Sequence, residues 1–331
     1  MATCLSFSTH GPAREVLSLQ SFEWVEPLAL DEVRIECCYA PINPADLNSI
    51  EGTYGRSPRL PAVAGHEGIG RVAELGAGIA DLELGDWVLP LCATGCWSSQ
   101  MRLQRCQLLR LPRDVDPIQA CMLRVNPATA WLLIDQHQQQ GGDGWLALNA
   151  SNSAVGECVI ALASQRGVPT LAFVRNESQV PALMALGATA AFTDDAKGFS
   201  EAKLRMKSEP GISTGLNAVG GDSALRMLEL LRPGGELITY GAMSKRSLKV
   251  SNRMLIFDDL RLSGFWLSRW YQTQSQDQIA GLLTQLARLQ SSGRLPIRID
   301  SIHPMTSYLE AIERAQQGGR SGKVLLELGG S

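Results

Sequence analysis

Residues 144–156 read GWLALNASNSAVG, and this stretch decides the fold of the chain. Its first six residues form an apolar run of the kind that a buried parallel strand shows. Residues 153–166 fit a helix, because apolar side chains such as Val155 and Val159 recur on one face. A strand that runs directly into a helix leaves free backbone N–H groups and the positive end of the helix dipole at the turn. The turn therefore predicts a site for an anion such as a dinucleotide pyrophosphate.

The turn keeps only part of the glycine pattern of dinucleotide sites. Of the usual G-x-G-x-x-G it retains the last glycine, Gly156, whereas Ser151 and Ser153 take the places of the first two. A strand–turn–helix that binds no ligand is the alternative. The strand expected over residues 170–174 favours a ligand, because its first polar residue is Arg175, whose guanidinium suits the 2′-phosphate of NADP. A solvated surface arginine is the alternative at that position.

Strands and helices alternate from about residue 125 to residue 265. We expect further strands over residues 190–192, 215–219 and 236–240, and helices over residues 179–186 and 223–231. Repeated β-α-β order predicts a doubly wound parallel sheet. The expected second domain is thus a Rossmann NADP-binding domain over residues 125–265.

The remainder of the chain has a different sequence pattern. Residues 33–37, 68–75 and 86–90 read as strands separated by Gly-rich turns, which predicts a compact β-rich domain. A tail with helices over residues 278–290 and 308–316 and a strand over 324–328 is expected to return to it. The fold class is therefore α/β, with a catalytic domain over residues 1–124 and 266–331.

Length, composition and charge exclude several classes of protein. The 331 residues are 45% hydrophobic and 19% charged, which is a globular composition long enough for two domains. A net charge of −3 argues against a nucleic-acid partner, and no apolar run is long enough to span a membrane. The N-terminus shows no secretory signal and no Arg-rich presequence, so we expect a cytoplasmic protein whose eight cysteines are mostly reduced.

One short motif suggests a metal site. Residues 65–68 read GHEG, yet the upstream segment 42–47 offers no cysteine or histidine, and a catalytic zinc needs three protein ligands. Cys92, Cys96 and Cys106 are too few and wrongly spaced for a four-cysteine cluster. We therefore expect no metal, and a packed or hydrogen-bonded His66.

Without a metal, proton delivery has to come from a side chain or from solvent. Tyr54 lies between two glycines, Gly52 and Gly55, on a segment expected to be a loop. A phenol, with an ordinary pKa of about 10, stays protonated at neutral pH and can donate to a developing enolate. A packing role for the ring is the alternative.

Together these segments resemble the zinc-free quinone-oxidoreductase-like branch of the medium-chain dehydrogenase/reductase superfamily, and within it the 2-enoyl thioester reductases of mitochondrial type. The resemblance covers residues 15–328, and the stretch 43–55 is shared with the wider branch. Four stretches are more specific to the thioester reductases: residues 125–130, 149–156, 240–243 and 255–268. The resemblance implies a GroES-like β-rich catalytic domain beside the Rossmann domain.

The resemblance also implies which residues form the site. The proton donor falls on Tyr54, the active-site tryptophan on Trp266, and the asparagine that contacts both cofactor and active site on Asn126. The implied cofactor contacts are Asn43, Asn126, Asn152, Ser153, Ala154, Val155, Gly156, Arg175, Asn176, Tyr240, Gly241, Ala242, Met243, Phe265, Trp266, Leu267, Ser268 and Lys323. A solvated tail lysine is the alternative for the last of these.

The implied activity is NADPH-dependent reduction of the C=C bond of a trans-2-enoyl thioester carried by CoA or acyl carrier protein. The shared stretch 43–55 leaves an NADPH:quinone or general enone reductase open. A non-catalytic NADPH-binding protein is a third reading, which the presence of both Tyr54 and Trp266 disfavours. The resemblance further implies a homodimer joined through the sheets of the cofactor domains.

Overall fold

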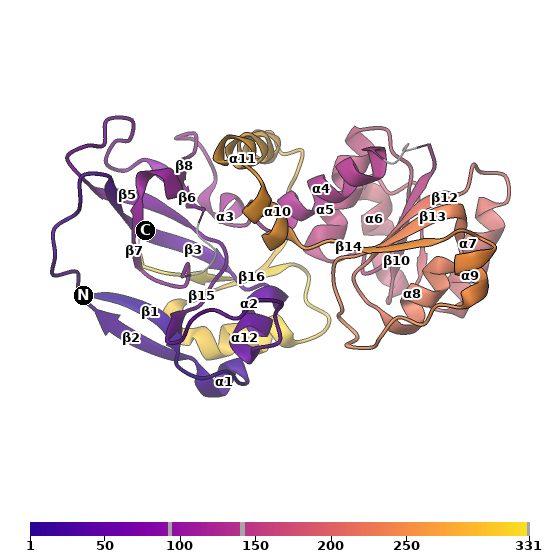
Figure 1. The fold of residues 1–331 in the computed structure, drawn as a ribbon, viewed down its shortest axis with the longest axis horizontal. Coiled ribbons are helices and arrows are strands. Elements are labelled where there is room, and N and C mark those ends of the chain that lie inside the picture. Colours follow the sequence, from indigo (N-terminus) through magenta and orange to yellow (C-terminus); the bar gives the residue numbers. More distant parts are fainter. Residues whose placement is uncertain (92–94, 140–142, 330–331) are drawn as a thin grey trace. The chain divides into compact units, whose positions relative to one another are not determined.

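The computed structural model describes residues 1–91, 95–139 and 143–329, which form two compact units (Figure 1). The N-terminal unit comprises residues 1–125 and 274–331, and the central unit comprises residues 126–273. The second division falls after residue 273, whereas the sequence predicts a boundary after residue 265. The boundary lies later because α10 (Leu267–Thr273) belongs to the central unit. The residues just before it are held there by a backbone hydrogen bond from Phe265 N to Thr239 O.

The central unit is built on a six-stranded sheet in which every neighbouring pair of strands is parallel. The strands, in spatial order, are β11 (Ala190–Thr193), β10 (Thr170–Val174), β9 (Trp145–Leu148), β12 (Ile212–Asn217), β13 (Leu231–Thr239) and β14 (Arg261–Gly264). The order reverses between β9 and β12, and ligands of open parallel sheets bind outside the carboxyl ends of the strands at such a reversal. The predicted doubly wound sheet is confirmed.

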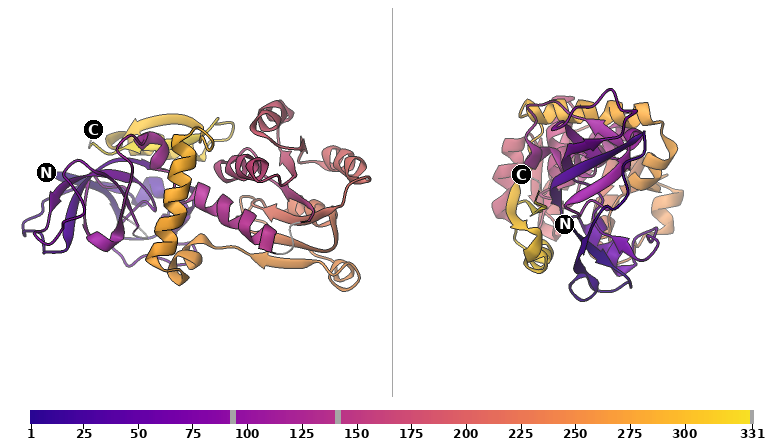
Figure 2. Two further views of the ribbon diagram at one scale, coloured as in Figure 1. Left: turned by 90° about the horizontal axis from the view of Figure 1, so that it is seen from above. Right: turned by 90° about the vertical axis from the view of Figure 1, so that its left-hand side faces the viewer.

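Helices lie on both faces of this sheet (Figure 2). They are α4 (Asn126–Gln139), α5 (Ala154–Gln165), α6 (Val180–Leu186), α7 (Ala196–Met206), α8 (Gly221–Leu228) and α9 (Asn252–Ile256), with the short turn η2 (Glu177–Gln179). Alternate strand residues such as Ala147 and Phe173 share one hydrophobic cluster with Phe199 of α7 and Met227 of α8. Among the described helices, none combines the length and the apolar character that a membrane span requires.

Several elements of the central unit differ from the sequence-based expectation. The helix expected over residues 223–231 ends at Leu228, because β13 already begins at Leu231. The strand expected over residues 215–219 ends at Asn217. β14 was not expected at all, since three of its four residues are exposed and it therefore lacks an apolar run.

The N-terminal unit contains two sheets. A seven-stranded sheet comprises β15 (Ile299–Pro304), β16 (Lys323–Glu327), β3 (Glu32–Pro41), β5 (Ile69–Leu75), β6 (Trp87–Pro90) and β8 (Leu108–Arg110), with β7 (Gln100–Gln104) paired to β3. A three-stranded sheet comprises β2 (Ser18–Phe22), β1 (Ala2–Phe7) and β4 (Ala62–Val63). Strands β15 and β16 come from the end of the chain, and β16 pairs with β3. The tail therefore returns to the β-rich domain, as the sequence predicts.

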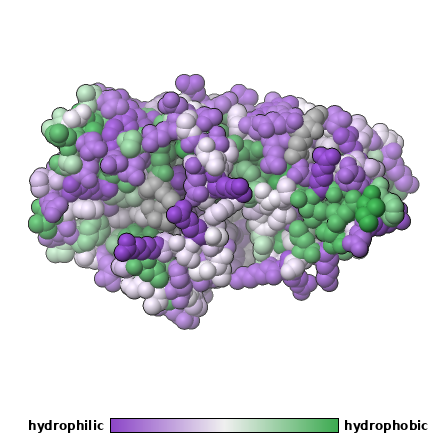
Figure 3. All heavy atoms as spheres, in the orientation of Figure 1, coloured by the Kyte–Doolittle hydropathy of each residue, from purple (hydrophilic) through white to green (hydrophobic). Residues whose placement is uncertain are grey.

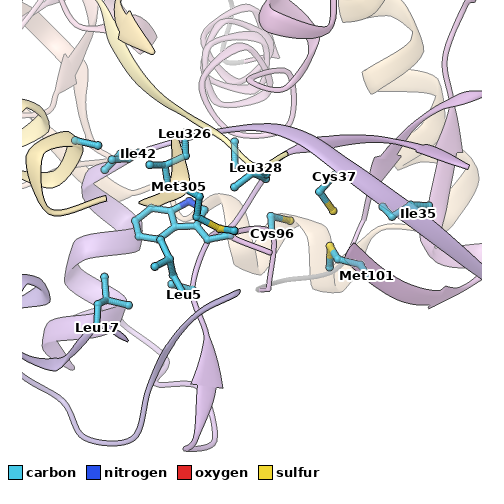
Figure 4. Packing of buried hydrophobic residues seen from close by; sticks show 14 of the residues in the cluster. Leu5, Leu17, Ile35, Cys37, Ile42, Cys96, Met101, Met305, Leu326 and Leu328 are labelled. Carbon is cyan, nitrogen blue, oxygen red and sulfur yellow. The ribbon is translucent and has the colours of Figure 1, made fainter. Parts of the chain in front are cut away.

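The helices of this unit are α1 (Ala13–Val16), α2 (Pro44–Glu51), α3 (Pro117–Ala120), α11 (Gln276–Ser291) and α12 (Tyr308–Gln316), with the short turns η1 (Arg105–Gln107) and η3 (Met305–Ser307). One hydrophobic core joins the two sheets and α12 (Figure 4). It brings Leu5 of β1 and Ile42 together with Leu326 of β16, and includes the buried thiols of Cys37 and Cys96. Of the eight cysteines, Cys92 lies outside the described residues.

The segment around Tyr54 is half helix and half loop. Residues 48–51, expected as loop, form the last turn of α2. Pro44 occupies the first turn, and the Asn43 N–H donates to the side chain of Asp46, so the helix carries its own start signal. It ends at Gly52, which adopts the left-handed conformation (φ 77°), and Tyr54 lies on the loop beyond it.

Candidate functional site

The turn between β9 and α5 is held by its own hydroxyl groups. The Ser153 side chain accepts a hydrogen bond from Gly156 N at 3.2 Å and so caps the helix. The Ser151 hydroxyl donates to Leu148 O at 2.8 Å and accepts from Phe173 N at 2.9 Å. These contacts fix the helix N-terminus at the carboxyl edge of the sheet. An anion can approach its N–H groups there.

Gly156 is required for this turn by packing. A Cβ atom at that position would lie 2.6 Å from the backbone oxygen of Ser151. The third glycine of the dinucleotide pattern thus keeps its usual role of close helix–strand approach, although serines replace the first two. Residues 152–155 are half-buried on the open side of the turn.

Two buried asparagines join the turn to the neighbouring loop, and sequence reasoning missed both. Asn149 Nδ2 donates to Asn217 Oδ1 at 2.9 Å, and Asn149 Oδ1 accepts from Ala218 N at 2.7 Å. Both side chains are fully buried. They stand at the carboxyl ends of β9 and β12, on either side of the point where the strand order reverses. The only signal in the sequence is an asparagine at the end of an apolar strand, twice.

The other proposed cofactor contacts of the central unit follow β13 and β14. Tyr240 N donates to Asn217 O at 3.0 Å, and Met243 N donates to Ala218 O at 2.9 Å. Burial raises the pKa of the Tyr240 phenol, and the neighbouring Ser153 hydroxyl lowers it by less. The residues 240–243 are thereby fixed next to the turn of α5. Residues 265–268 follow β14, the next strand of the same sheet edge.

Arg175 and Asn126 occupy different environments. Arg175 directly follows β10 and is exposed. Its neighbour Asn176 uses its side chain to cap η2, accepting from Ser178 N at 3.0 Å. Asn126 is buried at the start of α4.

In the N-terminal unit, a buried chain of hydrogen bonds links Lys323, Asn43 and Glu67. The Lys323 ammonium donates to Asn43 Oδ1, and to Ile42 O at 3.1 Å. Asn43 Nδ2 donates to Glu67 Oε1 at 2.8 Å, and Glu67 Oε2 accepts from Val125 N at 2.8 Å. Lys323 is therefore not a solvated tail lysine. Glu67 was not a sequence candidate, because nothing local indicates that its partner Asn43 is in turn bonded to a residue 280 positions away.

Burial shifts the pKa values of both charged groups toward neutrality. Desolvation raises the pKa of Glu67 to about 7, against the opposing effect of the Lys323 charge. Desolvation likewise lowers the pKa of Lys323 to about 8, against the charges of Glu67 and Asp46. Each charge only partly compensates the burial of the other, as expected for a buried pair.

Tyr54 lies beside a histidine that is held by a carboxylate. The rings of Tyr54 and His66 meet edge to face, with centroids 5.4 Å apart and planes inclined by 62°. His66 Nδ1 is 2.5 Å from Asp46 Oδ1, and His66 N donates to the same oxygen at 2.8 Å. The expectation of a packed, hydrogen-bonded His66 is met by these contacts.

Comparison with known proteins assigns the chain to a family. Residues 154–286 match the model of the zinc-binding dehydrogenases, and residues 29–113 match that of the alcohol dehydrogenase GroES-like domain. The mitochondrial enoyl-[acyl-carrier-protein] reductase of Mus musculus is 37% identical over 98% of this chain and 88% of its own length. The same enzyme of Homo sapiens is 37% identical over the same shares.

Solved structures have the same fold. A putative NADPH:quinone reductase from Bacillus thuringiensis superposes with a TM-score of 0.90 at 25% identity, covering 98% of both chains. The complex of Etr1p with NADP and crotonyl-CoA gives a TM-score of 0.88 at 24% identity, covering 98% of this chain and 99% of Etr1p.

The description of the first family names zinc, but the residues that we describe contain no set of zinc ligands. No group of three or more His, Cys, Asp or Glu side chains there is placed to hold a metal ion. His66 Nδ1 is bound to Asp46, and Asn43 is bound to Glu67 and Lys323. These side chains therefore bind one another and do not form a zinc ligand set.

Proposed function

We propose that this chain, which belongs to the medium-chain dehydrogenase/reductase superfamily and to its enoyl-[acyl-carrier-protein] reductase family, reduces the C=C bond of trans-2-enoyl thioesters with NADPH. The observation that carries the proposal is the extent of the similarity, which runs through both units and includes the segments of Tyr54 and of the phosphate-binding turn.

The chain's own groups account for cofactor binding. The N-terminus of α5 receives the pyrophosphate, with residues 152–156 in contact with it. Arg175 pairs with the 2′-phosphate, which distinguishes NADPH from NADH. Residues 240–243 and 265–268 line the nicotinamide side, together with Asn126. Asn43 and Lys323, which hydrogen-bond each other within the N-terminal unit, are the further cofactor contacts that we propose.

The reaction needs one proton and one site for developing charge. Bound NADPH supplies the hydride that adds to Cβ of the enoyl group. Negative charge then develops on the thioester oxygen, and Tyr54 donates its hydroxyl proton to Cα. Trp266 shapes the cleft that receives the acyl chain. Positioning and electrostatic stabilisation supply most of the rate acceleration in such a step.

The experiment that tests this function is an NADPH-oxidation assay over a substrate panel. Crotonyl-CoA, a crotonyl thioester of acyl carrier protein, simple enones and quinones are compared, each with NADPH and with NADH. We expect the enoyl thioesters to be turned over fastest and NADPH to be preferred. Faster turnover of quinones than of thioesters would favour the second candidate, a quinone reductase, which the likeness to the Bacillus thuringiensis protein supports.

We also propose that two copies associate through the β14 edge of the central sheet. β14 ends the strand order, and an unpaired edge strand is ready to pair with another chain. Large apolar side chains are exposed beside it, namely Leu255 (43%), Ile256 (68%), Phe257 (77%) and Leu262 (37%). This patch covers the region of β14 and α9 in Figure 3. Phe257→Glu should convert a dimer into a monomer in light scattering coupled to size-exclusion chromatography.

The place of the protein in the cell stays a proposal. The sequence-based expectation is the cytoplasm, whereas the curated relatives named above are mitochondrial enzymes. Fractionation of the source cells, with detection by an antibody against the protein, distinguishes a cytoplasmic from a mitochondrial location.

A further inference from the structure

We propose that His66, held by Asp46, is a positioning residue for Tyr54 in the thioester reduction proposed above, on which this inference rests. The same histidine lies where the sequence motif GHEG suggests a metal ligand. Its contacts give it a different role, because it connects a buried carboxylate to the ring of the proton donor.

Asp46 is a rigid support for the histidine. Its side chain is fully buried, whereas 13% of the His66 side chain is exposed. One carboxylate oxygen accepts from Asn43 N at 2.7 Å, and the other accepts from His66 N at 2.8 Å. Both oxygens are thereby fixed by backbone N–H groups, and the imidazole is oriented against a group that cannot turn.

The carboxylate also selects the tautomer of the neutral imidazole. An ionised carboxylate only accepts hydrogen bonds, so the short contact to Asp46 places the hydrogen of His66 on Nδ1. Nε2 is then the acceptor nitrogen, on the side of the ring away from Asp46. The orientation of the ring and the identity of its outward nitrogen both follow from one contact.

Tyr54 has a fixed backbone and a ring that needs lateral support. Thr53 N and Tyr54 N both donate to Asn48 O, at 2.9 and 3.1 Å, which anchors the loop to the end of α2. These bonds do not fix the side-chain torsions of Tyr54. The edge-to-face contact with His66 does so from one side, and such pairs are favourable beyond the area that they bury.

The imidazole is not needed for the local fold. His66 O accepts from Arg124 Nη1 at 2.6 Å, and its N–H is bound to Asp46, so the backbone is held at both ends. The preceding Gly65 packs directly against Trp97, which fixes the chain further. Removal of the imidazole should therefore leave the backbone in place and take away one lateral contact of the Tyr54 ring.

A double-mutant cycle measures the coupling between the two rings. His66→Ala, Tyr54→Phe and the double variant are compared by kcat on crotonyl-CoA and by KM for NADPH. We expect His66→Ala to lower kcat about tenfold, since small misplacements of a reacting group are costly in rate, and to leave KM for NADPH unchanged. In the Tyr54→Phe background the same change should alter kcat less than about twofold. Losses that multiply in the double variant would overturn the inference.

The matched control is His10→Ala. His10 is exposed and lies against Gly52, and its Nδ1 is 3.2 Å from Ile50 O, so it contacts the same helix end, while its ring lies against that of Phe7. We expect its kcat to equal that of the wild type. A loss equal to that of His66→Ala would show a general effect on the helix end and would contradict the positioning role.

A second measurement does not depend on turnover. In ¹⁵N-histidine NMR spectra, the wild type should show His66 with the hydrogen on Nδ1, and Tyr54→Leu, which removes the aromatic ring, should shift the His66 ring signals but not those of His10. A wild type that reduces no enoyl thioester overturns the proposed function. His66 signals that do not change in Tyr54→Leu, or a hydrogen on Nε2 instead, overturn the inference whatever the activity.

Discussion

The turn between β9 and α5 in the central unit and the Asn43–Glu67–Lys323 chain of hydrogen bonds in the N-terminal unit are both polar structures, but they differ in how charge takes part. In the turn, Ser153 bonds to a residue three positions away, Ser151 bonds to Leu148 and to Phe173 of the neighbouring strand, and no charged group takes part in these bonds. In the chain, the hydrogen bonds join residues that are 24 and 280 positions apart, and both ends carry charge.

Because of this difference, the stability of the two regions should depend on different interactions. The turn depends on local backbone geometry, so sterics at single positions should control it. The chain depends on two desolvated charges that compensate each other, so its stability should vary with pH and should fail when one partner is removed. Substitutions in each region test whether the two regions differ in this way.

The largest effect is expected when the buried pair is broken. Glu67→Gln leaves the Lys323 ammonium without its countercharge and places an amide against Val125 N, so we expect a loss of about 3 kcal/mol or more in the free energy of unfolding. Urea unfolding followed by tryptophan fluorescence measures it. The double variant Glu67→Gln/Lys323→Met should lose less than Glu67→Gln alone. An equal or larger loss in the double variant would show that the charges are not coupled.

The pH dependence of the same pair has a definite sign. The folded pKa of Glu67, about 7, lies above its ordinary value of 4.5, so its contribution is fully present below pH 4.5 and is lost as pH rises to about 7. The folded pKa of Lys323, about 8, lies below its ordinary value of 10.5, so its contribution is present above pH 10.5 and is lost as pH falls to about 8. In Glu67→Gln the decline between about pH 5 and pH 7 should shrink.

Tyr54→Phe tests whether catalysis can be lost in the N-terminal unit without a loss of its stability. We expect kcat on crotonyl-CoA to fall about 100-fold or more, the range for a lost general acid. The unfolding free energy should stay close to that of the wild type, because the loop is held by backbone bonds to Asn48. Steady-state kinetics and urea unfolding of the same preparations check both. Unchanged turnover would remove Tyr54 from the mechanism.

The same contrast explains how far the sequence could predict this protein. The strand over residues 170–174 and the helix over residues 308–316 were predicted with the bounds that the structure has, since apolar periodicity records burial directly. β14 was missed because an exposed edge strand has no such pattern. The helix predicted over residues 153–166 extends one residue beyond each end of α5.

Hydrogen-bond partners that are far apart in the sequence could not be predicted from it. Glu67 was passed over, and Lys323 could be given a solvated alternative, because neither residue's neighbours in the sequence indicate a buried partner. The same holds for Asn149 and Asn217, which meet only once β9 and β12 are adjacent in the sheet. Family resemblance supplied Asn43 and Lys323 as site residues, and the structure supplied their hydrogen bond.

Gly156→Ala tests the local character of the turn. The added Cβ would lie 2.6 Å from Ser151 O, so the turn has to shift, and we expect the Kd for NADPH to rise about 30-fold, the equivalent of about 2 kcal/mol of overpacking. Gly281→Ala is the matched control, because Gly281 is also helical, is exposed on α11 and has open space around it. Fluorescence titration measures both. Equal affinities in the two variants would mean that the turn does not carry the cofactor.

Arg175→Ala should have the smallest effect, because it removes one exposed charge and leaves the turn intact. We expect the Kd for NADPH to rise about tenfold, the lower range for a charge-assisted hydrogen bond, and the Kd for NADH to stay the same. Arg288→Ala, an exposed arginine of α11, controls for the loss of one positive charge. The two cofactors differ only in the 2′-phosphate, so an equal loss for both would place Arg175 elsewhere on the cofactor. An unchanged Kd for NADPH would leave it as a solvated arginine, and the binding free energy would then come from the α5 turn alone.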